Sequence, residues 1–263
     1  MTIALASTLH DPEGRMVEQA RRALPVLART FDGIAIAASH DAHPNLLALF
    51  IEAGASIVRG TPEQAVERFK LGQVRRNAIA LALKLDCPFI LHCDCDRMLH
   101  WAERYPDELA QVARRVTEYD FTVLGRTQRA FDSHPRIQRD TESIVNHVFG
   151  LVSGQAWDVT AAARGLSRRA AEAILIGCPD EEVSTDVTWT LCLDQQNGLT
   201  LGYIETEGLE FETADRYTDQ VAQVGGLAQW MARLDSDPRN WAHRLEMARV
   251  EVEGTLAYLK TRA

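Results

Sequence analysis

Two aspartates separated by a single residue end a short apolar run in the first half of the chain. Residues 89–96 read FILHCDCD, and a Cys-Pro pair before them is typical of the end of a helix. Side chains alternate along an extended segment, so His92, Asp94 and Asp96 are expected on one side of it. Two carboxylates that close repel each other unless a cation lies between them. The pattern therefore predicts a divalent metal ion, Mg²⁺ or Mn²⁺, bound by Asp94 and Asp96 together with substrate phosphates.

Three alternatives compete with the metal site for these residues. A solvated turn can contain two aspartates by chance, although the position after a buried strand favours the metal. Zinc-type ligands also occur here, namely His92, Cys93, Cys95 and His100. Their spacing does not match paired C-x₂₋₄-C arrangements, and cysteines beside a strand are more typical of the core. Phosphoaspartyl hydrolases carry D-x-D on the first strand of their domain, whereas three strand–helix units precede it here.

The composition limits the class of protein. The 263 residues are 46% hydrophobic and 25% charged, which is typical of a globular chain with a sizeable core. A formal net charge of −9 disfavours a nucleic-acid partner, because binders of the phosphate backbone carry basic patches. No apolar run approaches the ~18 residues of a membrane span, and the N-terminal segment lacks the basic region of a signal peptide. Five cysteines without a paired framework favour a reducing, cytoplasmic location.

The first hundred residues alternate strands with helices. Short apolar runs predict strands at 2–8, 33–39, 56–59 and 89–93. Helical spacing of apolar residues predicts helices at 15–30, 45–53 and 62–85. Strands of near-continuous hydrophobicity separated by helices indicate a parallel sheet that is covered on both faces.

The second half is less regular. Strands are predicted at 121–127, 156–162 and 200–206, helices at 137–152, 167–175 and 185–193, and a polar loop from 127 to 133. Residues from 220 onward have an amphipathic helical pattern, broken near 235–238, which can pack on the core or on a second subunit of a homo-oligomer. We find no internal repeat and no linker, so we expect one α/β domain with a helical C-terminal extension.

Polar residues follow each strand of the predicted parallel sheet. Open parallel sheets bind ligands at the carboxyl ends of their strands. One rim should therefore bring together the residues at 7–10, 39–41, 59–61 and 94–96.

The strand–helix alternation that leads to D-x-D resembles the GT-A fold of nucleotide-sugar glycosyltransferases, a family that includes dolichyl-phosphate mannose synthase and mannosylglycerate synthase. Upstream, GQVRRN at 72–77 is similar to the G-x-x-x-R-N element of that family, whose helix start faces the nucleotide diphosphate. The resemblance implies that Arg76 and Asn77 bind the diphosphate, and such side chains near a helix N-terminus suit phosphate oxygens. Arg75 is expected on an exposed basic face. The resemblance also implies a nucleotide site at the rim, formed by Ser7, Thr8, His10, Ser39, Asp41 and Asp94.

Downstream, Ser153-Gly154 and the segment 159–164 are similar to the S-G-x-R-type segment that lines the donor-sugar pocket of this family. The resemblance implies that Gly154, Trp157 and Asp158 contact the sugar or the acceptor. Glycine permits close backbone approach, and the other two offer an apolar face and a hydrogen-bond acceptor. The alternatives are a turn role for Gly154 and a core position for Trp157.

The acidic segment PDEEVSTD, which ends at Asp186, resembles the one that carries the catalytic or acceptor-binding carboxylate of this fold. In an inverting enzyme Asp186 would take the proton of the acceptor hydroxyl, and in a retaining enzyme it would position acceptor or sugar. The alternative is that Asp186 caps its helix. Some retaining relatives add a histidine metal ligand, but none occurs here between His147 and His243. Glu212 and Asp215 are the nearby carboxylates that can replace it.

The resemblance implies a metal-dependent glycosyltransferase, a hexosyltransferase, that uses a UDP- or GDP-linked sugar and an unidentified small-molecule acceptor. Residues 1–218 would form the catalytic domain, with a nucleotide-binding half (1–100) and a sugar and acceptor half (101–218), and residues 219–263 the helical extension. A non-catalytic sugar-nucleotide-binding protein, a nucleotidyltransferase and a phosphoaspartyl-type phosphatase are the alternatives. The Gly-rich N-terminal signature of sugar nucleotidyltransferases is missing.

Overall fold

Seven strands form one mixed sheet in the part of the chain that the computed structural model describes, residues 2–61 and 70–259. Their order across the sheet is β3 (Ser56–Arg59), β2 (Gly33–Ala38), β1 (Ile3–Leu9), β4 (Phe89–His92), β6 (Ala163–Ser167), β5 (Phe121–Arg126) and β7 (Leu201–Thr206). The first four run parallel, β6 is antiparallel to both of its neighbours, and β5 and β7 are parallel to each other. Ala6 pairs with His92, so β1 and β4 end at the same rim.

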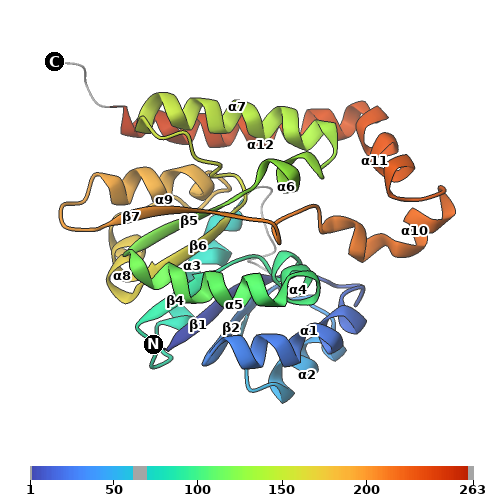
Figure 1. Ribbon diagram of the computed structural model, residues 1–263, viewed down its shortest axis with the longest axis horizontal. Helices are drawn as coiled ribbons and strands as arrows, with labels where there is room; N and C mark the ends of the chain where they lie inside the picture. The colour runs from blue at the N-terminus through green and yellow to red at the C-terminus, as the bar shows by residue number, and fades with distance from the viewer. Residues whose placement is uncertain (1, 62–69, 260–263) are drawn as a thin grey trace.

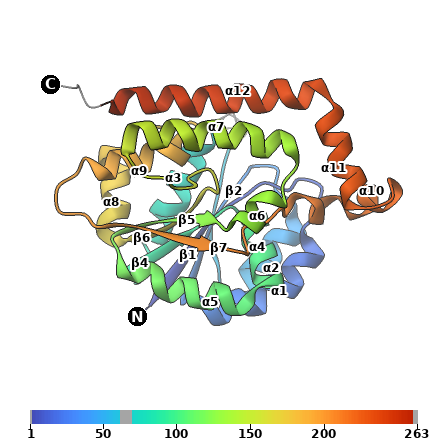
Figure 2. The same ribbon diagram turned by 45° about the horizontal axis from the view of Figure 1, so that its top comes forward.

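Helices cover both faces of the sheet (Figure 1). One face carries α1 (Val17–Thr30), α2 (Pro44–Glu52), α4 (Cys95–Arg104) and α5 (Pro106–Arg115). The other carries α3 (Leu71–Ala82), α8 (Arg168–Gly177) and α9 (Thr185–Asp194), and on that side α7 (Arg136–Ser153) and α12 (Pro238–Thr255) lie side by side (Figures 1 and 2). The shorter elements are η2 (Val116–Glu118), α6 (Gln128–Asp132), η3 (Thr213–Tyr217), α10 (Thr218–Gln223), α11 (Leu227–Ser236) and η4 (Leu256–Tyr258).

The two faces of the sheet carry side chains of different size. Toward α1 and α2, strands β1 and β2 present large residues such as Leu5 and Ile36, whereas the buried hydrophobic residues that they present toward α3 are all alanines. Successive residues of a strand face opposite sides, so this pattern follows directly from the alternation along the two strands. The alanine surface lets α3 lie close against the strands and brings its polar N-terminal half to the rim.

The α/β class, the mostly parallel sheet and the elements of the first half are confirmed, with ends that differ by a few residues. Residues 62–69, the start of the expected helix 62–85, lie outside the described residues. Two expectations for the second half were wrong. The strand expected at 156–162 is β6, at Ala163–Ser167, because Ala162 has a left-handed φ of 58° that ends the turn before it. The expected polar loop contains α6, capped by the Thr127 hydroxyl, which accepts from the N–H of Ala130.

The C-terminal segment packs on the core of the domain. The predicted break is present, because α11 ends at Ser236 and Pro238 opens α12. On α12, Ala248, Glu251 and Thr255 are buried against α7 and α9. No helix in the described ranges combines the length and the apolar composition that crossing a bilayer requires.

The absence of a paired cysteine framework was a wrong expectation. Cys178, just after α8, and Cys192, in α9, form a disulfide, because the packing of the two helices brings their Cα atoms to 6.0 Å. Cysteine usage therefore does not support the predicted cytoplasmic location. Cys93 and Cys95 are buried in the apolar core, as expected of core residues and not of zinc ligands.

The close approach of α3 to the segment before α9 predicts a specific sensitivity at Gly72. A Cβ added there would lie 2.5 Å from the carbonyl oxygen of Glu182, a backbone atom that cannot move freely. We expect Gly72→Ala to lower the free energy of unfolding by roughly 1–3 kcal/mol, as overpacking does. Gly150→Ala, in α7, is the control: its added Cβ meets its nearest atom at 3.4 Å, so it should be neutral or stabilise by up to ~1 kcal/mol. Equal effects in urea unfolding would contradict the close approach.

Candidate functional site

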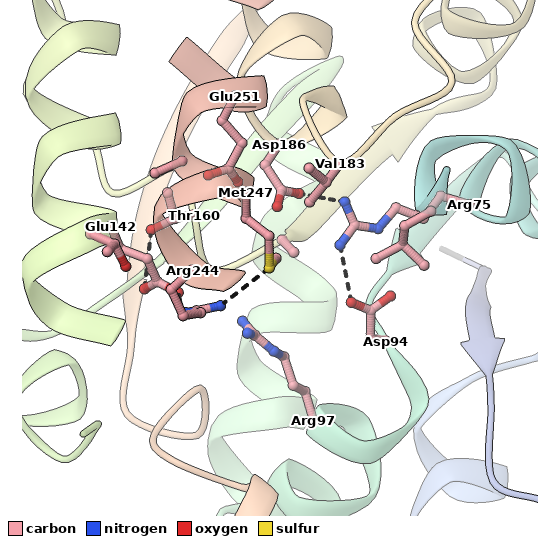
Figure 3. Close-up of a pocket in the computed structure, with 14 residues that line it drawn as sticks. Arg75, Asp94, Arg97, Glu142, Thr160, Val183, Asp186, Arg244, Met247 and Glu251 are labelled. Carbon is pink, nitrogen blue, oxygen red and sulfur yellow. Dashed lines mark hydrogen bonds and ion pairs between the residues drawn. The ribbon is translucent and has the colours of Figure 1, made fainter. Parts of the chain in front are cut away.

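A small polar cavity of about 120 Å³ lies beside the D-x-D sequence, between α3, α4, α7, α9 and α12. Most of its wall is charged, as Figure 3 shows for Arg75, Asp94, Arg97, Glu142, Asp186, Arg244 and Glu251. A cavity that offers hydrogen-bond donors and acceptors at this density suits a polar ligand and not an apolar one.

The guanidinium of Arg75 joins two of these carboxylates. It donates through Nη1 to Oδ1 of Asp186 over 2.6 Å and through Nη2 to Oδ2 of Asp94 over 3.1 Å (Figure 3). The Arg75 side chain is only 3% exposed, so its expected place on an exposed basic face was wrong. Burial by itself would favour the neutral form, but the charges of Asp186 and Asp94 outweigh it and raise the pKa of Arg75.

The two aspartates respond differently to the same arginine. Burial opposes ionisation of Asp94, but the Arg75 charge overcomes it, so the pKa of Asp94 lies well below its usual range. For Asp186 burial dominates and raises the pKa, although Arg75 and Arg164 pull it down. The expected capping role of Asp186 is not what the structure shows. Ser184 is the N-cap residue of α9, and Asp186 lies in the first turn with its carboxylate on Arg75.

Asp94 and Asp96 do not lie on one side of a strand, as alternation predicted. β4 ends before Asp94, which is the N-cap of α4, and Asp96 lies in the first turn of that helix. Oδ1 of Asp96 accepts from the N–H of Arg97 over 2.9 Å, and Oδ2 lies 3.3 Å from Nη1 of Arg216. Each aspartate therefore has an arginine of its own, Arg75 or Arg216, and neither needs a shared cation to relieve repulsion.

Glu212 and Asp215, the two residues considered as a further metal ligand, differ in whether their carboxylate oxygens already have partners. Within residues 2–61 and 70–259, no group of three His, Cys, Asp or Glu side chains is arranged to hold a metal. Asp215 is committed, because it pairs with Nδ1 of His100 over 2.6 Å and accepts from Gln19 over 2.8 Å. Glu212 is buried, and its Oε2 has no hydrogen-bond partner among the described residues. Burial and the charge of Asp96 raise its pKa, against the opposing charge of Arg97.

This donor set fits a hard divalent cation. Asp96 stands at the rim with its side chain 24% exposed, and its 3.3 Å contact with Arg216 is long for a hydrogen bond. Glu212 supplies an unpartnered oxygen nearby. Mg²⁺ and Mn²⁺ take one or two carboxylates and complete their coordination with water and substrate phosphates. The residues present therefore fit such an ion at Asp96 and Glu212, and fit it less well at Asp94, where both oxygens have protein partners.

Ser7 and Thr8, two of the rim residues predicted to bind the nucleotide, connect the end of β1 to the end of β4. The Ser7 hydroxyl, which is buried, donates to the carbonyl of Cys93 over 2.6 Å. The Thr8 hydroxyl donates to Oδ1 of Asp94 over 2.6 Å. Thr8 therefore orients the carboxylate at the point where the predicted nucleotide site begins, whereas Ser7 has a structural contact.

The other predicted rim residues form a polar surface at the ends of β1 and β2. Nδ1 of His10 lies 3.1 Å from Oγ of Ser39 and 3.6 Å from Oδ1 of Asp41. Arg216 reaches the same place, because its Nη2 donates to the carbonyl of His10 over 3.3 Å. The tertiary structure thus brings His10, Ser39 and Asp41 together next to the arginine that contacts Asp96.

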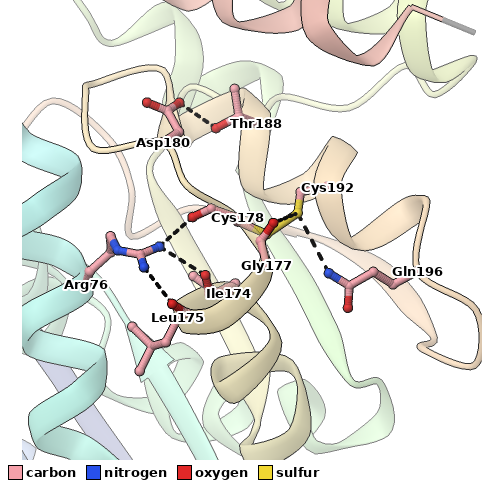
Figure 4. Close-up of a disulfide and its surroundings, with 9 residues drawn as sticks. All are labelled: Arg76, Ile174, Leu175, Gly177, Cys178, Asp180, Thr188, Cys192 and Gln196. Carbon is pink, nitrogen blue, oxygen red and sulfur yellow. Dashed lines mark hydrogen bonds between the residues drawn. A yellow bond between two sulfur atoms is a disulfide. The ribbon is translucent and has the colours of Figure 1, made fainter.

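Arg76 and Asn77 lie away from the cavity. The Arg76 guanidinium donates to three carbonyls at the end of α8, beside the disulfide (Figure 4), those of Ile174, Leu175 and Cys178. Carbonyls at a helix end lack partners within the helix, so Arg76 completes them and ties α8 to α3. Asn77 bonds within α3, to a side chain one turn earlier. The predicted contact of Arg76 with a diphosphate is therefore not what the structure shows.

The three residues predicted to contact sugar or acceptor do not line the cavity either. Gly154 ends α7 with a left-handed φ of 77°, as helix-ending glycines do, so the turn role accounts for it. Trp157 stacks on Tyr203, with ring centroids 5.5 Å apart and planes 7° apart. Asp158 accepts from Nε and Nη2 of Arg126 over 2.7 and 2.9 Å.

The segment that follows them does reach the cavity, through Thr160 and Ala162. Within the stretch 153–164 that carries the resemblance, the cavity wall is thus formed by Thr160 and Ala162 and not by the three predicted residues. Ala162 carries the left-handed φ, which costs a residue with a Cβ roughly 1–2 kcal/mol. Strain of this kind persists where the surrounding structure enforces it, and here Nη2 of Arg164 holds the segment by donating to the carbonyl of Asp186 over 2.6 Å.

Sequence analysis missed the part of the wall that comes from α7 and α12. Glu142 of α7 and Arg244, Met247 and Glu251 of α12 line the cavity, and Nη2 of Arg244 donates to Oε1 of Glu142 over 2.7 Å. The spacing did indicate a shared helix face, because Arg244 and Glu251 are seven residues apart and lie on the same side as Ala248, which is buried. Without the fold, nothing indicated what that face contacts.

No protein-family model matches the chain, and no curated protein sequence matches it. Solved structures do. Glucosyl-3-phosphoglycerate synthase from Mycobacterium tuberculosis, in complex with Mn²⁺, UDP and glucosyl-3-phosphoglycerate, aligns with a TM-score of 0.59 at 11% identity, over 98% of this chain and 80% of that one. Its complex with Mn²⁺, UDP-glucose and phosphoglyceric acid aligns with a TM-score of 0.54 at 13% identity, over 94% and 80%. At this identity the likeness concerns the fold alone, and it confirms the expected GT-A fold.

Replacement of Arg75 should lower the free energy of unfolding far more than replacement of an exposed arginine. Arg75→Met leaves two buried carboxylates without their cation, which typically costs about 3–5 kcal/mol. Arg59→Met, at an exposed position in β3, should change stability by less than about 0.5 kcal/mol. The double variant Arg75→Met/Asp186→Asn should recover part of the loss, because it removes one stranded charge. Urea unfolding checks this, and additive losses would contradict a direct Arg75–Asp186 interaction.

The surroundings of Glu251 predict that the stability difference between the wild type and Glu251→Gln depends on pH. Burial, with the carboxylates of Asp186 and Glu142 facing it, raises its pKa well above the usual value, against the opposing charges of Arg244 and Arg75. A raised pKa means that stability is fully present below the unfolded value of ~4.3 and is lost as pH rises through the folded pKa. The neutral amide escapes that loss. The variant should gain stability over the wild type as pH rises above about 5, as urea unfolding at several pH values measures.

The exposed Glu253→Gln, two residues along α12, is the matched control and should track the wild type at every pH. A wild type that is as stable as Glu251→Gln across the whole range would show that the Glu251 carboxyl is not shifted.

Proposed function

We propose that the chain is a metal-dependent glycosyltransferase that moves a sugar from a UDP-linked donor to a small acceptor carrying an anionic group. The observation that carries this proposal is the Arg75 bridge between Asp94 and Asp186. It places a helix-borne carboxylate next to the D-x-D sequence, in a polar cavity at the rim where open α/β sheets bind ligands. The shared fold with enzymes solved in complex with UDP and Mn²⁺ supports the choice of donor.

The donor nucleotide would lie across the ends of β1, β2 and β4. His10, Ser39 and Asp41 form a polar surface there that suits a base and a ribose. Thr8 and Asp94 stand between that surface and the cavity, so the diphosphate would pass them with the sugar directed inward. Arg216, at the rim, adds positive charge where phosphate oxygens arrive.

Asp96 and Glu212 would hold the metal ion, with Asp94 behind them and in contact with it through water or with the ribose. Bound there, Mg²⁺ or Mn²⁺ neutralises charge on the departing diphosphate as a Lewis acid. The protein's own part is to supply the two carboxylates from separate elements, the start of α4 and the segment before η3, so that their spacing depends on the fold.

Asp186 would act at the other end of the transferred sugar. In the reaction the bond between the anomeric carbon and the diphosphate breaks, a bond to the acceptor oxygen forms, and the hydroxyl proton leaves. Arg75 holds Oδ1 of Asp186, which fixes the carboxylate in the cavity wall. Its raised pKa makes Asp186 a stronger base than an exposed aspartate, which suits a group that accepts a hydroxyl proton or a hydrogen bond.

Two arginines favour an anionic acceptor. Arg97 and Arg244 extend into the cavity from α4 and α12 (Figure 3). Arg97 donates to the carbonyl of Ala161 and Arg244 to Glu142, which leaves further N–H groups on each planar guanidinium. Guanidinium forks bind carboxylate and phosphate groups well. A phosphorylated hydroxy acid such as phosphoglyceric acid, present in the solved complexes of the enzyme with the same fold, is therefore the acceptor to test first.

Nucleotide binding gives the first test. We expect UDP with Mn²⁺ to raise the melting temperature of the wild type, because a ligand at ~100 times its dissociation constant adds about 2.7 kcal/mol of stability. Asp96→Asn and Glu212→Gln should each abolish the metal-dependent part of the shift, whereas Asp215→Asn should retain it. GDP with Mn²⁺ is the control for the base. No shift with either nucleotide and either metal would rule out a nucleotide-sugar transferase.

Catalysis needs a separate measurement, because a sugar-nucleotide-binding protein would give the same shift. We expect UDP release from UDP-glucose with Mn²⁺ and phosphoglyceric acid, and a fall of about 10²–10⁴-fold in Asp186→Asn without loss of UDP binding. Binding without turnover in any donor and acceptor combination would indicate the non-catalytic alternative. Release of inorganic phosphate, inhibited by beryllofluoride, would indicate the phosphatase.

A further inference from the structure

Glu251 is a buried residue whose carboxylate has no hydrogen-bond or ion-pair partner among residues 2–61 and 70–259. Its side chain is 6% exposed and lines the cavity from α12, near Asp186 (Figure 3). No hydrogen bond or ion pair joins the Glu251 carboxylate to another described residue, whereas its neighbour Glu142 binds both Arg126 and Arg244. The carboxylate faces the cavity, so it is open to a hydrogen-bond donor that enters there.

The packing of α12 fixes where Glu251 lies. One turn after it, Gly254 meets the first turn of α9 so closely that an added Cβ would be 2.8 Å from Cβ of Ser184. Two turns before it, Arg244 is tied to Glu142 of α7. The carboxylate therefore stands between two anchored points of the helix and is held over the cavity, opposite the α3 side from which Arg75 enters.

The surroundings of Glu251 indicate the chemistry of its missing partner. Asp186 and Glu142 face it as carboxylates, and Arg244 and Arg75 are the nearest positive charges. A second anion would be repelled at this end of the cavity. A neutral group with O–H donors satisfies a carboxyl group without adding charge, and adjacent hydroxyls of a sugar are such donors.

The place of the cavity distinguishes the donor sugar from the acceptor. Its wall includes Asp94, beside the predicted nucleotide site, then Asp186, which shares Arg75 with Asp94, and then Glu251, which is close to Asp186. In a nucleotide-diphosphate sugar, the sugar is the group directly beyond the diphosphate. It is therefore the first neutral polyol that reaches the carboxyl of Glu251.

We propose that Glu251 of the C-terminal helix binds a hydroxyl of the transferred sugar and determines which sugar the cavity accepts. This assignment rests on the proposed transferase function and adds α12 to its sugar site. The sugar hydroxyl donates to the Glu251 carboxyl on one side while Asp186 contacts the sugar or the acceptor hydroxyl from the other. Asp186 and Glu251 then form the two acidic sides of one sugar subsite.

The experiment separates the sugar from the nucleotide. Calorimetric affinities for UDP and for UDP-glucose, each with Mn²⁺, are measured on the wild type, Glu251→Gln and Glu253→Gln, and then repeated with the monodeoxy analogues of UDP-glucose. We expect Glu251→Gln to bind UDP as the wild type does and to bind UDP-glucose about 3- to 10-fold more weakly, the usual effect of weakening a hydrogen bond between neutral groups. The exposed Glu253→Gln should bind both as the wild type does.

The analogues identify the hydroxyl. One deoxy analogue should bind the wild type about 3- to 10-fold more weakly than UDP-glucose and should bind Glu251→Gln no more weakly than UDP-glucose does. Normal UDP binding with an unchanged preference for UDP-glucose in Glu251→Gln would overturn the sugar assignment and leave the transferase proposal intact. A wild type that binds neither UDP nor UDP-glucose would overturn both. Because glutamine keeps the shape of the side chain and cannot ionise, a folding defect is not expected, and circular dichroism of each variant checks this.

Discussion

The ion pairs of one buried guanidinium organise the site. Arg75 can stay charged at 3% exposure only because Asp94 and Asp186 contact it, and those aspartates come from different parts of the chain. Three elements must therefore meet at one point: the end of β4, the first turn of α9, and α3, which approaches closely because it has glycine at position 72. A buried ion pair of this kind specifies geometry more than it stabilises, because desolvation offsets much of its attraction. The charges are thus placed for ligands, at a cost that the apolar layers on both faces of the sheet offset.

The second organising feature is that arginines lie beside Asp94 and Asp96, where the sequence predicted a divalent metal ion. The repulsion between Asp94 and Asp96 is relieved by Arg75 on one side and Arg216 on the other. These two contacts differ in kind. The first is buried, whereas the second is at the rim, long, and shared with the carbonyl of His10. In the proposed function, a metal–diphosphate unit would compete for Asp96 at the rim and would leave the buried Arg75 pair in place.

The C-terminal helix changes how the domain should be divided. Residues after about 220 looked like an appendage in the sequence, but α12 supplies Arg244 and Glu251 to the cavity wall and is anchored on α7 and α9. A catalytic unit that ends at residue 218 would therefore be open at the side of its predicted sugar site. The solved structures with the same fold align over nearly the whole chain at 11–13% identity, so the architecture persists while most side chains differ. Residue roles then have to be argued from contacts in this chain.

The sequence by itself determined the α/β class, most elements of the first half and the rim where polar residues gather, because hydrophobic periodicity is a local property. It also singled out Asp94 and Asp186, which the structure places in the wall of one cavity. Only the tertiary structure decided which of two neighbouring residues in the sequence faces the cavity. Arg75 faces the cavity and Arg76 faces α8, although they are adjacent, because one position along a helix turns a side chain by about 100°. Tertiary contacts also separate Asp158, which binds Arg126, from Thr160, which lines the cavity. The neighbours of Glu251 in the cavity wall come from distant parts of the chain. Long-range packing sets those contacts, and no local pattern contains it.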